Sequence, residues 1–370
     1  MRTQKGTNVT DEIGFAIVGC GMIAGYHAQA IKAAAGARLI AVADRDAGRT
    51  QSFAAAHGAR EATTNLEELL ALPDVHVVCI TTPSGAHLDP ALAAIRKGKH
   101  VLVEKPIEIT VERATRIVRA AAERGVLAGA VFQSRLTQAA RAIKHAVEQG
   151  RFGRMVLASA GIKWHRSTEY YRGSWKGTRL LDGGGALMNQ GIHAVDLLQW
   201  FAGRPAEVQA RTTRRVHLGI EVEDTAVATL RFPDGALGVI EATTAAYPGW
   251  ERRIELCGEA GSAVLEDDRI VRWDFRREQP GDAAIRAGSL ASATGSGASA
   301  PDAISFEGHR RQIEDMVNAL RNGMPLAIDG AAALNAISLI QAIYSAAESG
   351  RTVAVEGRER VNDPVSANET

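Results

Sequence analysis

A lysine that could take part in catalysis follows an apolar run near residue 100. Residues 100–106 (HVLVEKP) read as a buried strand that ends in an acid, an amine and a proline. Ligands of open α/β sheets bind beyond the carboxyl ends of the strands. There Lys105 can stabilise a developing alkoxide, and burial lowers the pKa of such an amine so that it can join a proton relay. The alternative is a solvated salt bridge between Glu104 and Lys105, and the upstream sequence favours the catalytic interpretation.

The upstream sequence carries the pattern of a dinucleotide site. Residues 19–24 (GCGMIA) match G-x-G-x-x-A, follow an apolar run and open an amphipathic segment. Gly19 makes the turn and Gly21 lets the backbone approach a pyrophosphate, while the small sixth residue lets the helix pack on the strand. Asp44 ends a second apolar run about 20 residues later, where an acid binds ribose hydroxyls. We therefore expect Gly19, Gly21, Met22, Ile23 and Asp44 to bind a nicotinamide dinucleotide.

The residues after the second strand favour NAD as the cofactor. Asp44 would repel the 2′-phosphate of NADP, whereas the adjacent Arg45 could accept it, so NADP stays as a minority alternative. Thr82 and Pro83 follow another apolar run, and their turn is suited to backbone contacts with the cofactor. His87 fits a cofactor contact and a packed helix-start residue equally well.

A second group of candidate residues follows a run of glycines. In residues 182–196 (DGGGALMNQGIHAVD) Asn189 and His193 share a helix face at i,i+4, and Asp196 lies one turn beyond. Gly191 costs a helix about 1 kcal/mol, which suggests that another group approaches the backbone there. An imidazole is a natural base for a substrate hydroxyl. A helical histidine is often structural, and the spacing alone leaves both roles for His193 open.

Aromatic and cationic residues gather between residues 163 and 177. Such a mixture suits a polyhydroxylated or anionic substrate, because rings stack on sugar faces and cations bind carboxylate or phosphate. We expect Lys163 and Arg172 to contact the substrate beside Lys105, Asn189 and His193. A surface loop with anchoring aromatics is the alternative. The histidine and cysteine spacings predict no metal site.

The composition fits a globular protein of about two domains. The 370 residues are 46% hydrophobic and 23% charged, and the net charge of +1 gives no reason to expect nucleic acid or membrane as a partner. Three scattered cysteines are too few for a disulfide framework and indicate a reducing, cytoplasmic setting. The first dozen residues lack the apolar core of a signal peptide, and no apolar stretch approaches the ~18 residues of a membrane span.

The alternation of apolar and amphipathic segments predicts an α/β protein with two domains. Predicted strands at 15–19, 39–44, 75–80, 101–104 and 126–132 alternate with helices at 23–35, 47–57, 66–71, 86–97 and 111–124. This order indicates a doubly wound parallel Rossmann sheet. Strands at 222–232, 236–244 and 252–256, with helices at 137–149, 186–201, 309–322 and 331–349, indicate a second α/β domain with a large, open, mainly antiparallel sheet. We expect a flexible tail at 1–12, domains at 13–134 and 135–354, a loose loop at 279–303 and a tail at 355–370.

In these residues and motifs the chain resembles the glucose-fructose oxidoreductase, inositol dehydrogenase and rhizopine-catabolism (Gfo/Idh/MocA) superfamily. The motifs are residues 19–24, Thr82-Pro83 with His87, residues 104–106 and residues 183–196. The resemblance implies a pyranose or cyclitol substrate between the two domains, and Lys105 with His193 as the catalytic pair. It also implies cofactor contacts from Glu104, Lys105, Gln133 and Trp175, and a homodimer or homotetramer formed through the C-terminal sheet.

The sequence departs from the common pattern of this family at three positions. Other segments narrow the range of expected substrates. Asn189 stands where the family commonly has an aspartate, so a Lys-Asp-His relay is in doubt; Ser84 and Gln133 replace asparagines. Residues 175–177, 188–190 and 220–225 look like the branch of UDP-N-acetylglucosaminuronate 3-dehydrogenases, which implies hydride transfer from C3 of a sugar or sugar nucleotide. The alternatives are an inositol or free-sugar dehydrogenase, a redox-neutral glycosidase with tightly bound NAD, and a non-catalytic nucleotide-binding regulator.

Overall fold

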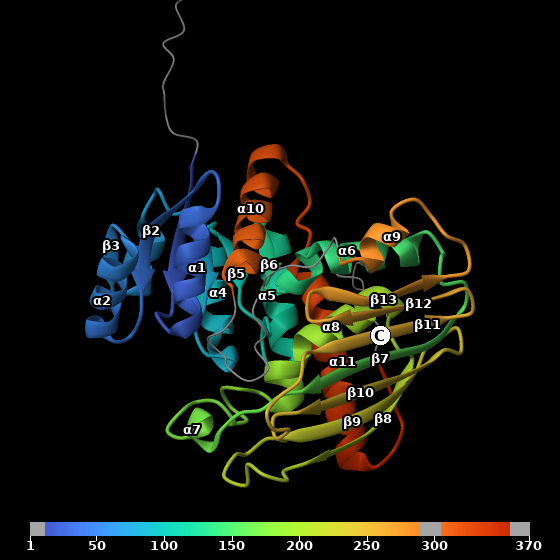
Figure 1. Ribbon diagram of the computed structural model, residues 1–370. Helices are drawn as coiled ribbons and strands as arrows, with labels where there is room; N and C mark the ends of the chain where they lie inside the picture. Colours follow the sequence, from blue (N-terminus) through green and yellow to red (C-terminus); the bar gives the residue numbers. More distant parts are fainter. Residues whose placement is uncertain (1–11, 289–304, 356–370) are drawn as a thin grey trace, which may run out of the picture.

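A computed structural model of the chain describes residues 12–288 and 305–355. The predicted tails and most of the predicted loop at 279–303 lie outside these residues. The described chain forms two sheets that lie beside one another, the N-terminal one in blue and the C-terminal one in green to orange (Figure 1). The two sheets confirm the predicted fold class.

The first sheet is parallel and has six strands in the order β3-β2-β1-β4-β5-β6. Every residue of β4 is buried, as expected where helices cover both faces of a parallel sheet. Its strands are β1 (Ile13–Val18), β2 (Ala37–Ala43), β3 (Glu61–Thr63), β4 (Val77–Ile80), β5 (His100–Val103) and β6 (Ala128–Ala130). The helices of this part are α1 (Met22–Ala33), α2 (Ala47–His57), α3 (Leu66–Ala71), α4 (Leu88–Arg96) and α5 (Val111–Arg124), with short 3₁₀ turns at Ser84–Ala86 and Gln133–Leu136. The next helix, α6 (Gln138–Glu148), packs against the second sheet and its helices.

The second sheet has eight strands in the order β13-β12-β11-β7-β10-β9-β8-β14. Within this sheet, β7–β10 is the only parallel pair among the described residues, and the other strand pairs are antiparallel. Buried and exposed residues alternate along β9, so one face packs on helices and the other is exposed. Its strands are β7 (Met155–Lys163), β8 (Glu207–Thr213), β9 (Thr225–Arg231), β10 (Leu237–Thr243), β11 (Arg253–Gly258), β12 (Gly261–Glu266), β13 (Arg269–Phe275) and β14 (Val353–Ala354). The helices are α7 (Thr168–Tyr171), α8 (Ile192–Ala202), α9 (Asp282–Arg286), α10 (Glu307–Asn322) and α11 (Gly330–Ser349).

Two parts of the predicted organisation need correction. The helix predicted at 186–201 begins as a π-helical segment, Ala186–Gly191, and only then continues as α8. Within the predicted loop at 279–303, the short helix α9 forms because Asp282 binds Arg151 and the ring nitrogen of Trp273. The expected boundary near residue 134 falls in the turn Gln133–Leu136 and stays a prediction.

The chain returns from the second sheet to the first through α10. This helix packs against α1, and its residues Ile313, Met316 and Val317 belong to the core cluster of the N-terminal sheet. Because α10 begins at Glu307, it brings His309 to the carboxyl edge of that sheet, beside Glu104. A segment more than two hundred residues away in the sequence thus completes the wall of the site.

One helix in the described part of the chain, α11, is long and apolar enough to pass a length-and-composition test for a membrane span. Half of its apolar window is buried inside the protein. The buried side packs against α5, α8 and β8, as in a core helix of a globular domain.

Candidate active site

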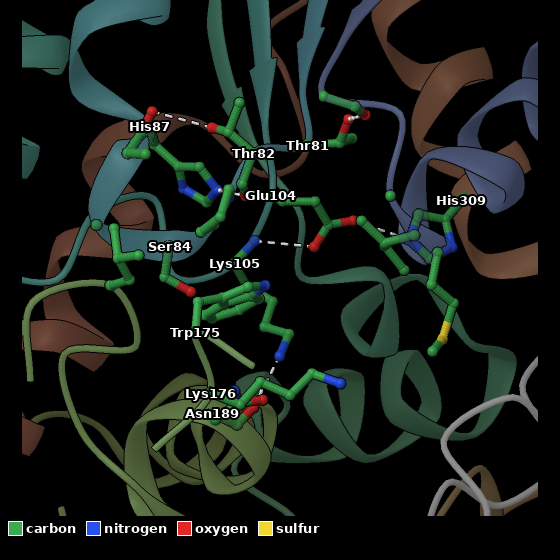
Figure 2. A pocket seen from close by; sticks show the side chains of 18 of the residues that line it. Thr81, Thr82, Ser84, His87, Glu104, Lys105, Trp175, Lys176, Asn189 and His309 are labelled. Carbon is green, nitrogen blue, oxygen red and sulfur yellow. Dashed lines mark hydrogen bonds and ion pairs between the residues drawn. The ribbon is translucent and has the colours of Figure 1, made fainter. Parts of the chain in front are cut away.

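A cavity of about 960 Å³ lies where the carboxyl ends of the parallel strands face the second domain. Figure 2 shows Lys105 near its centre, with Thr82 and His87 on one side and Glu104 and His309 on the other. All the residues that the sequence assigned to the cofactor line this cavity: Gly19, Gly21, Met22, Ile23, Asp44, Arg45, Thr82, Pro83, His87, Glu104, Lys105, Gln133 and Trp175. The tertiary structure therefore brings these positions together.

The glycine turn has the shape that a dinucleotide needs. Gly19 has φ +99°, and a Cβ there would lie 2.8 Å from the backbone nitrogen of Thr82. A Cβ on Gly21 would meet nothing within 4 Å, so the space beside the start of α1 is open. Gly21 caps α1 without a side-chain hydrogen bond, which leaves the first N–H groups of the helix for an anion. These observations fit a pyrophosphate at this turn.

Asp44 lies beside the same turn. Its carboxylate accepts hydrogen bonds from the backbone N–H groups of Cys20, at 2.8 Å, and of Asp46, at 3.0 Å. These bonds fix the side chain at the cavity wall, where it could bind ribose hydroxyls. Arg45 and Arg49 also line the cavity. The residues present thus fit NAD, and one of the two arginines, Arg49, lies 3.5 Å from the Asp44 carboxylate.

His87 bridges two loops of the site. Its Nε2 lies 2.8 Å from the carbonyl oxygen of Thr82, and its Nδ1 lies 2.9 Å from that of Pro106. The ring is 1% exposed, yet it contributes to the cavity wall. Burial lowers the pKa of His87, against the contacts that raise it. Both of the sequence-based alternatives therefore describe part of its environment: it packs, and it holds the cofactor turn against the loop that carries Lys105.

Glu104 is the centre of a buried hydrogen-bonded group. Its Oε1 lies 2.8 Å from His27 Nε2 and 3.1 Å from His309 Nε2, and its Oε2 accepts the Lys105 N–H. Burial alone would raise the pKa of Glu104, but the bonds from the two histidines outweigh it and hold the pKa well below its usual range.

The same three residues stand close enough to be considered as metal ligands. Two ligands of a tetrahedral zinc ion, each about 2.0 Å from the metal, would be roughly 3.3 Å apart. The observed distances of 2.8 and 3.1 Å are instead hydrogen-bond lengths. We therefore treat His27, Glu104 and His309 as an anionic hydrogen-bonded triad that fixes the backbone next to Lys105.

Lys105 reaches from this triad to the second domain. The Lys105–Pro106 peptide is cis, and the Lys105 Nζ donates to the backbone carbonyl of Asn189 at 2.7 Å (Figure 2). Burial lowers the pKa of Lys105, while the nearby carboxylates of Glu104 and Asp182 oppose that change. An amine with a lowered pKa and a defined direction is suited to stabilise an oxyanion and to exchange a proton.

His193 lines the cavity from the first turn of α8. Burial and the positive charges of Lys105 and Arg252 hold its pKa well below the usual range, so the ring is neutral near pH 7. Its Nδ1 is buried without a hydrogen-bond partner among the described residues. Asp196 is not that partner, because it forms a buried ion pair with Arg135 that ties α8 to the turn at Gln133–Leu136. A neutral imidazole can accept a proton from a hydroxyl.

The glycine run positions this face of the site by close packing. A Cβ on Gly184 would lie 2.2 Å from the Tyr344 hydroxyl, and one on Gly185 would lie 1.7 Å from the Glu223 carbonyl oxygen. The buried Glu223 carboxylate accepts the N–H groups of Gly185 and Leu187, both at 2.9 Å. This cap holds the π-helical segment that turns Asn189 and His193 towards Lys105. Glu223 falls within residues 220–225, but its role as a cap was not predicted, because its partners lie 38 and 36 residues away in the sequence.

Only part of the aromatic and cationic segment lines the cavity, and the two predicted substrate contacts in it do not. Lys163 pairs with Glu241 at 2.6 Å, and Arg172 is exposed beside Glu169; neither lines the cavity. The members that do line it are Trp164, Arg166, Tyr170, Trp175 and Lys176. The Lys176 Nζ lies 3.9 Å from the centre of the Tyr170 ring.

The chain matches two family descriptions that together span most of both domains. Residues 13–132 match the "Oxidoreductase family, NAD-binding Rossmann fold", and residues 140–264 match the "GFO/IDH/MocA C-terminal domain". The chain belongs to the Gfo/Idh/MocA family. It is accordingly an oxidoreductase with an NAD-binding Rossmann domain, as the sequence motifs predicted, and NAD is its cofactor.

Curated proteins and a solved structure resemble this chain over 70–95% of its length. The WlbA dehydrogenase from Bordetella pertussis, solved in complex with NADH and UDP-GlcNAcA, is 34% identical with a TM-score of 0.84, over 95% of this chain and 100% of that chain. The inositol 2-dehydrogenase of Rhizobium meliloti is 26% identical over 92% of this chain and 98% of its own length. The inositol 2-dehydrogenase 2 of Saccharopolyspora erythraea is 31% identical over 70% of this chain and 78% of its own length.

Proposed function

We propose that the protein oxidises a secondary hydroxyl of a pyranoside, at C3 of a sugar nucleotide such as a UDP-linked uronate, and that Lys105 and His193 are its catalytic residues. The observation that carries the proposal is that these two side chains, from different domains, line one cavity with the nucleotide turn. NAD, when bound, accepts the hydride. His193 accepts the hydroxyl proton because its ring is neutral, and the Lys105 ammonium stabilises the oxygen on which negative charge develops.

The charge of the wall supports an anionic substrate. Lys176 forms no ion pair with a carboxylate among the described residues, and its ammonium faces the cavity over the Tyr170 ring. Burial lowers the pKa of Lys176, which means that its charge is incompletely solvated. A substrate carboxylate or phosphate would compensate this charge. The similarity to a structure that contains UDP-GlcNAcA supports the same class of substrate.

The first experiment is a substrate panel with purified protein, in which NADH absorbance reports net oxidation. UDP-GlcNAcA is expected to be turned over, and UDP-GlcNAc, which lacks the carboxylate, to be a poorer substrate. A preference for myo-inositol would instead assign the protein to the inositol dehydrogenases, the second candidate that the curated relatives support. Absence of NADH formation with every sugar would refute a dehydrogenase.

Matched variants then test the two reacting groups. Lys105→Met and His193→Asn should each lower kcat by a factor of about 10² or more, since each removes a general acid, base or oxyanion donor. Lys32→Met and His145→Asn change an exposed lysine and an exposed histidine outside the cavity and should leave kcat unchanged. If both catalytic-site variants retained turnover within a few-fold of the unmodified protein, these roles would be wrong.

A further inference from the structure

The loop before the glycine run contributes a buried carboxylate that the sequence assigned to no role. Asp182 is 1% exposed, lies one residue before Gly183 and contacts Asn189, which lines the cavity. Its Oδ2 accepts the backbone N–H of Gly177 at 2.7 Å, and its Oδ1 accepts the side-chain Nδ2 of Asn189 at 2.6 Å. Asn189 is the residue whose carbonyl oxygen accepts the Lys105 ammonium at 2.7 Å.

These contacts connect Lys105 to Asp182 through one neutral residue. The lysine donates to the main chain of Asn189, and the side chain of Asn189 donates to Asp182. Asn189 carries no charge, so it cannot compensate the ammonium by itself. The second nearby acid, Glu104, already accepts two histidines and a backbone N–H. The carboxylate of Asp182 therefore acts on Lys105 in addition to that of Glu104, and it does so from the second domain.

We infer that Asp182 is a positioning residue that supplies, through Asn189, the negative charge which keeps Lys105 protonated and directed at the substrate oxygen. This inference deepens the proposed function and rests on Lys105 acting as proposed there. Burial raises the pKa of Asp182 to about 6, against the N–H of Gly177, the amide of Asn189 and the charges of Lys105 and Lys176. The carboxylate is thus charged in neutral solution and becomes neutral in mild acid.

Other charged and titratable groups act on Lys105 or on Asp182 and must be considered in any pH experiment. They come from the end of β5, from the β7–α7 segment, from α8 and from α11. These groups are Glu104, Arg166, Tyr170, Tyr171, Lys176, His193 and Tyr344. A substitution that keeps the shape of Asp182 leaves all of them in place.

The test measures the protonation of Lys105 directly. The protein without substrate is pulse-labelled with acetic anhydride across a pH series, and acetylation of Lys105 is quantified by peptide mass spectrometry with exposed Lys32 as the internal reference. Only the unprotonated amine reacts. In Asp182→Asn, loss of the nearby negative charge should move the labelling midpoint of Lys105 down by about one pH unit. The labelling curves of the two proteins should converge below about pH 6, where Asp182 itself is neutral.

A charge-swap variant separates charge from shape. In Asp182→Asn with Asn189→Asp, the amide at 182 can still accept from Gly177 and donate to residue 189, and the negative charge is restored. This double variant should move the Lys105 midpoint and kcat back towards the unmodified protein. A purely structural role for Asp182 would lower kcat in the single variant without moving the midpoint.

Two outcomes would overturn the inference: a midpoint in Asp182→Asn that stays within a few tenths of a unit, or a swap variant that does not shift it back. If Asp182→Asn does not fold, Asp182→Ser removes the same charge, keeps an oxygen that can accept the Gly177 N–H and should also lower the midpoint; no movement would overturn the inference as well. Because labelling needs no sugar, failure of the substrate panel refutes only the proposed function. An unmoved midpoint together with an inactive Lys105→Met refutes only the role of Asp182.

Discussion

Replacing Asp44 by asparagine should weaken NADH binding and improve NADPH binding. The carboxylate is fixed by the N–H groups of Cys20 and Asp46 and lines the cavity beside Arg45 and Arg49. Asparagine keeps an oxygen that can accept the Cys20 N–H, so the glycine turn should hold its shape. The variant therefore removes chiefly the charge that would bind ribose hydroxyls.

The size of the effect follows from the bond that is lost. A hydrogen bond to a charged group contributes about 1.5–3 kcal/mol, and 1.4 kcal/mol is a factor of ten in affinity. Loss of one such bond to a ribose hydroxyl should weaken NADH binding by about 10- to 150-fold. NADPH should bind more tightly than to the unmodified protein, because the repulsion between the Asp44 carboxylate and its 2′-phosphate disappears while Arg45 and Arg49 remain.

Isothermal titration calorimetry with NADH and NADPH measures both affinities without knowledge of the sugar. Asp74→Asn is a matched control, since Asp74 pairs with Arg60 on the surface and does not line the cavity. A change in the NADH dissociation constant below about threefold, with no gain for NADPH, would show that Asp44 does not bind the ribose.

Three other predictions concern backbone shape, a buried ion pair and pH. Gly19→Ala should weaken NADH binding at least about tenfold, since a Cβ at this left-handed position collides with the backbone of Thr82. Gly58 is also left-handed but borders open space, so Gly58→Ala should cost about 1 kcal/mol of stability and leave NADH binding unchanged in the same titration. Arg135→Met should lower the free energy of unfolding in urea by about 3–5 kcal/mol, because it leaves the buried Asp196 without its cation; a loss below about 1 kcal/mol would contradict this. The pKa of Asp182 is raised from 3.8 to about 6 in the folded state, so the folded protein binds a proton more tightly than the unfolded chain. The free energy of unfolding of the unmodified protein should therefore rise by up to about 3 kcal/mol relative to that of Asp182→Asn as the pH falls from 7 to 4. Urea unfolding at both pH values that shows no such rise would refute the raised pKa.

The local elements were predictable because their signals lie within a few residues of one another. The helices Ala47–His57, Leu66–Ala71 and Val111–Arg124 have the predicted ends. The Asp234-Gly235 turn joins β9 and β10 as an antiparallel hairpin, with Gly235 at φ +93°. In contrast, the three-residue strand β3 was missed, since so short a segment has no readable period.

The candidate site was predictable only in part. Most cofactor positions could be found because they follow strands, and the carboxyl ends of parallel strands meet at one edge; Trp175 lies in the second part of the chain and followed only from the family resemblance. Lys163 and Arg172 were expected at the substrate from the composition of their segment, and in the structure they pair with Glu241 and Glu169 and do not line the cavity. His27 and His309 could not be found, because nothing local relates either residue to Glu104.

The sequence by itself determined the nucleotide turn, the acid that follows it, the lysine at the end of β5 and the histidine after the glycine run. These features depend on backbone conformation and on neighbours along the chain. The tertiary structure decided which groups act on Lys105: the Asn189 carbonyl 84 residues away, Asp182 behind it, and a Glu104 carboxylate fixed by His309 from 205 residues away. Burial and electrostatic interactions depend on distance in space, so the charge of the lysine is set by contacts that no local pattern records.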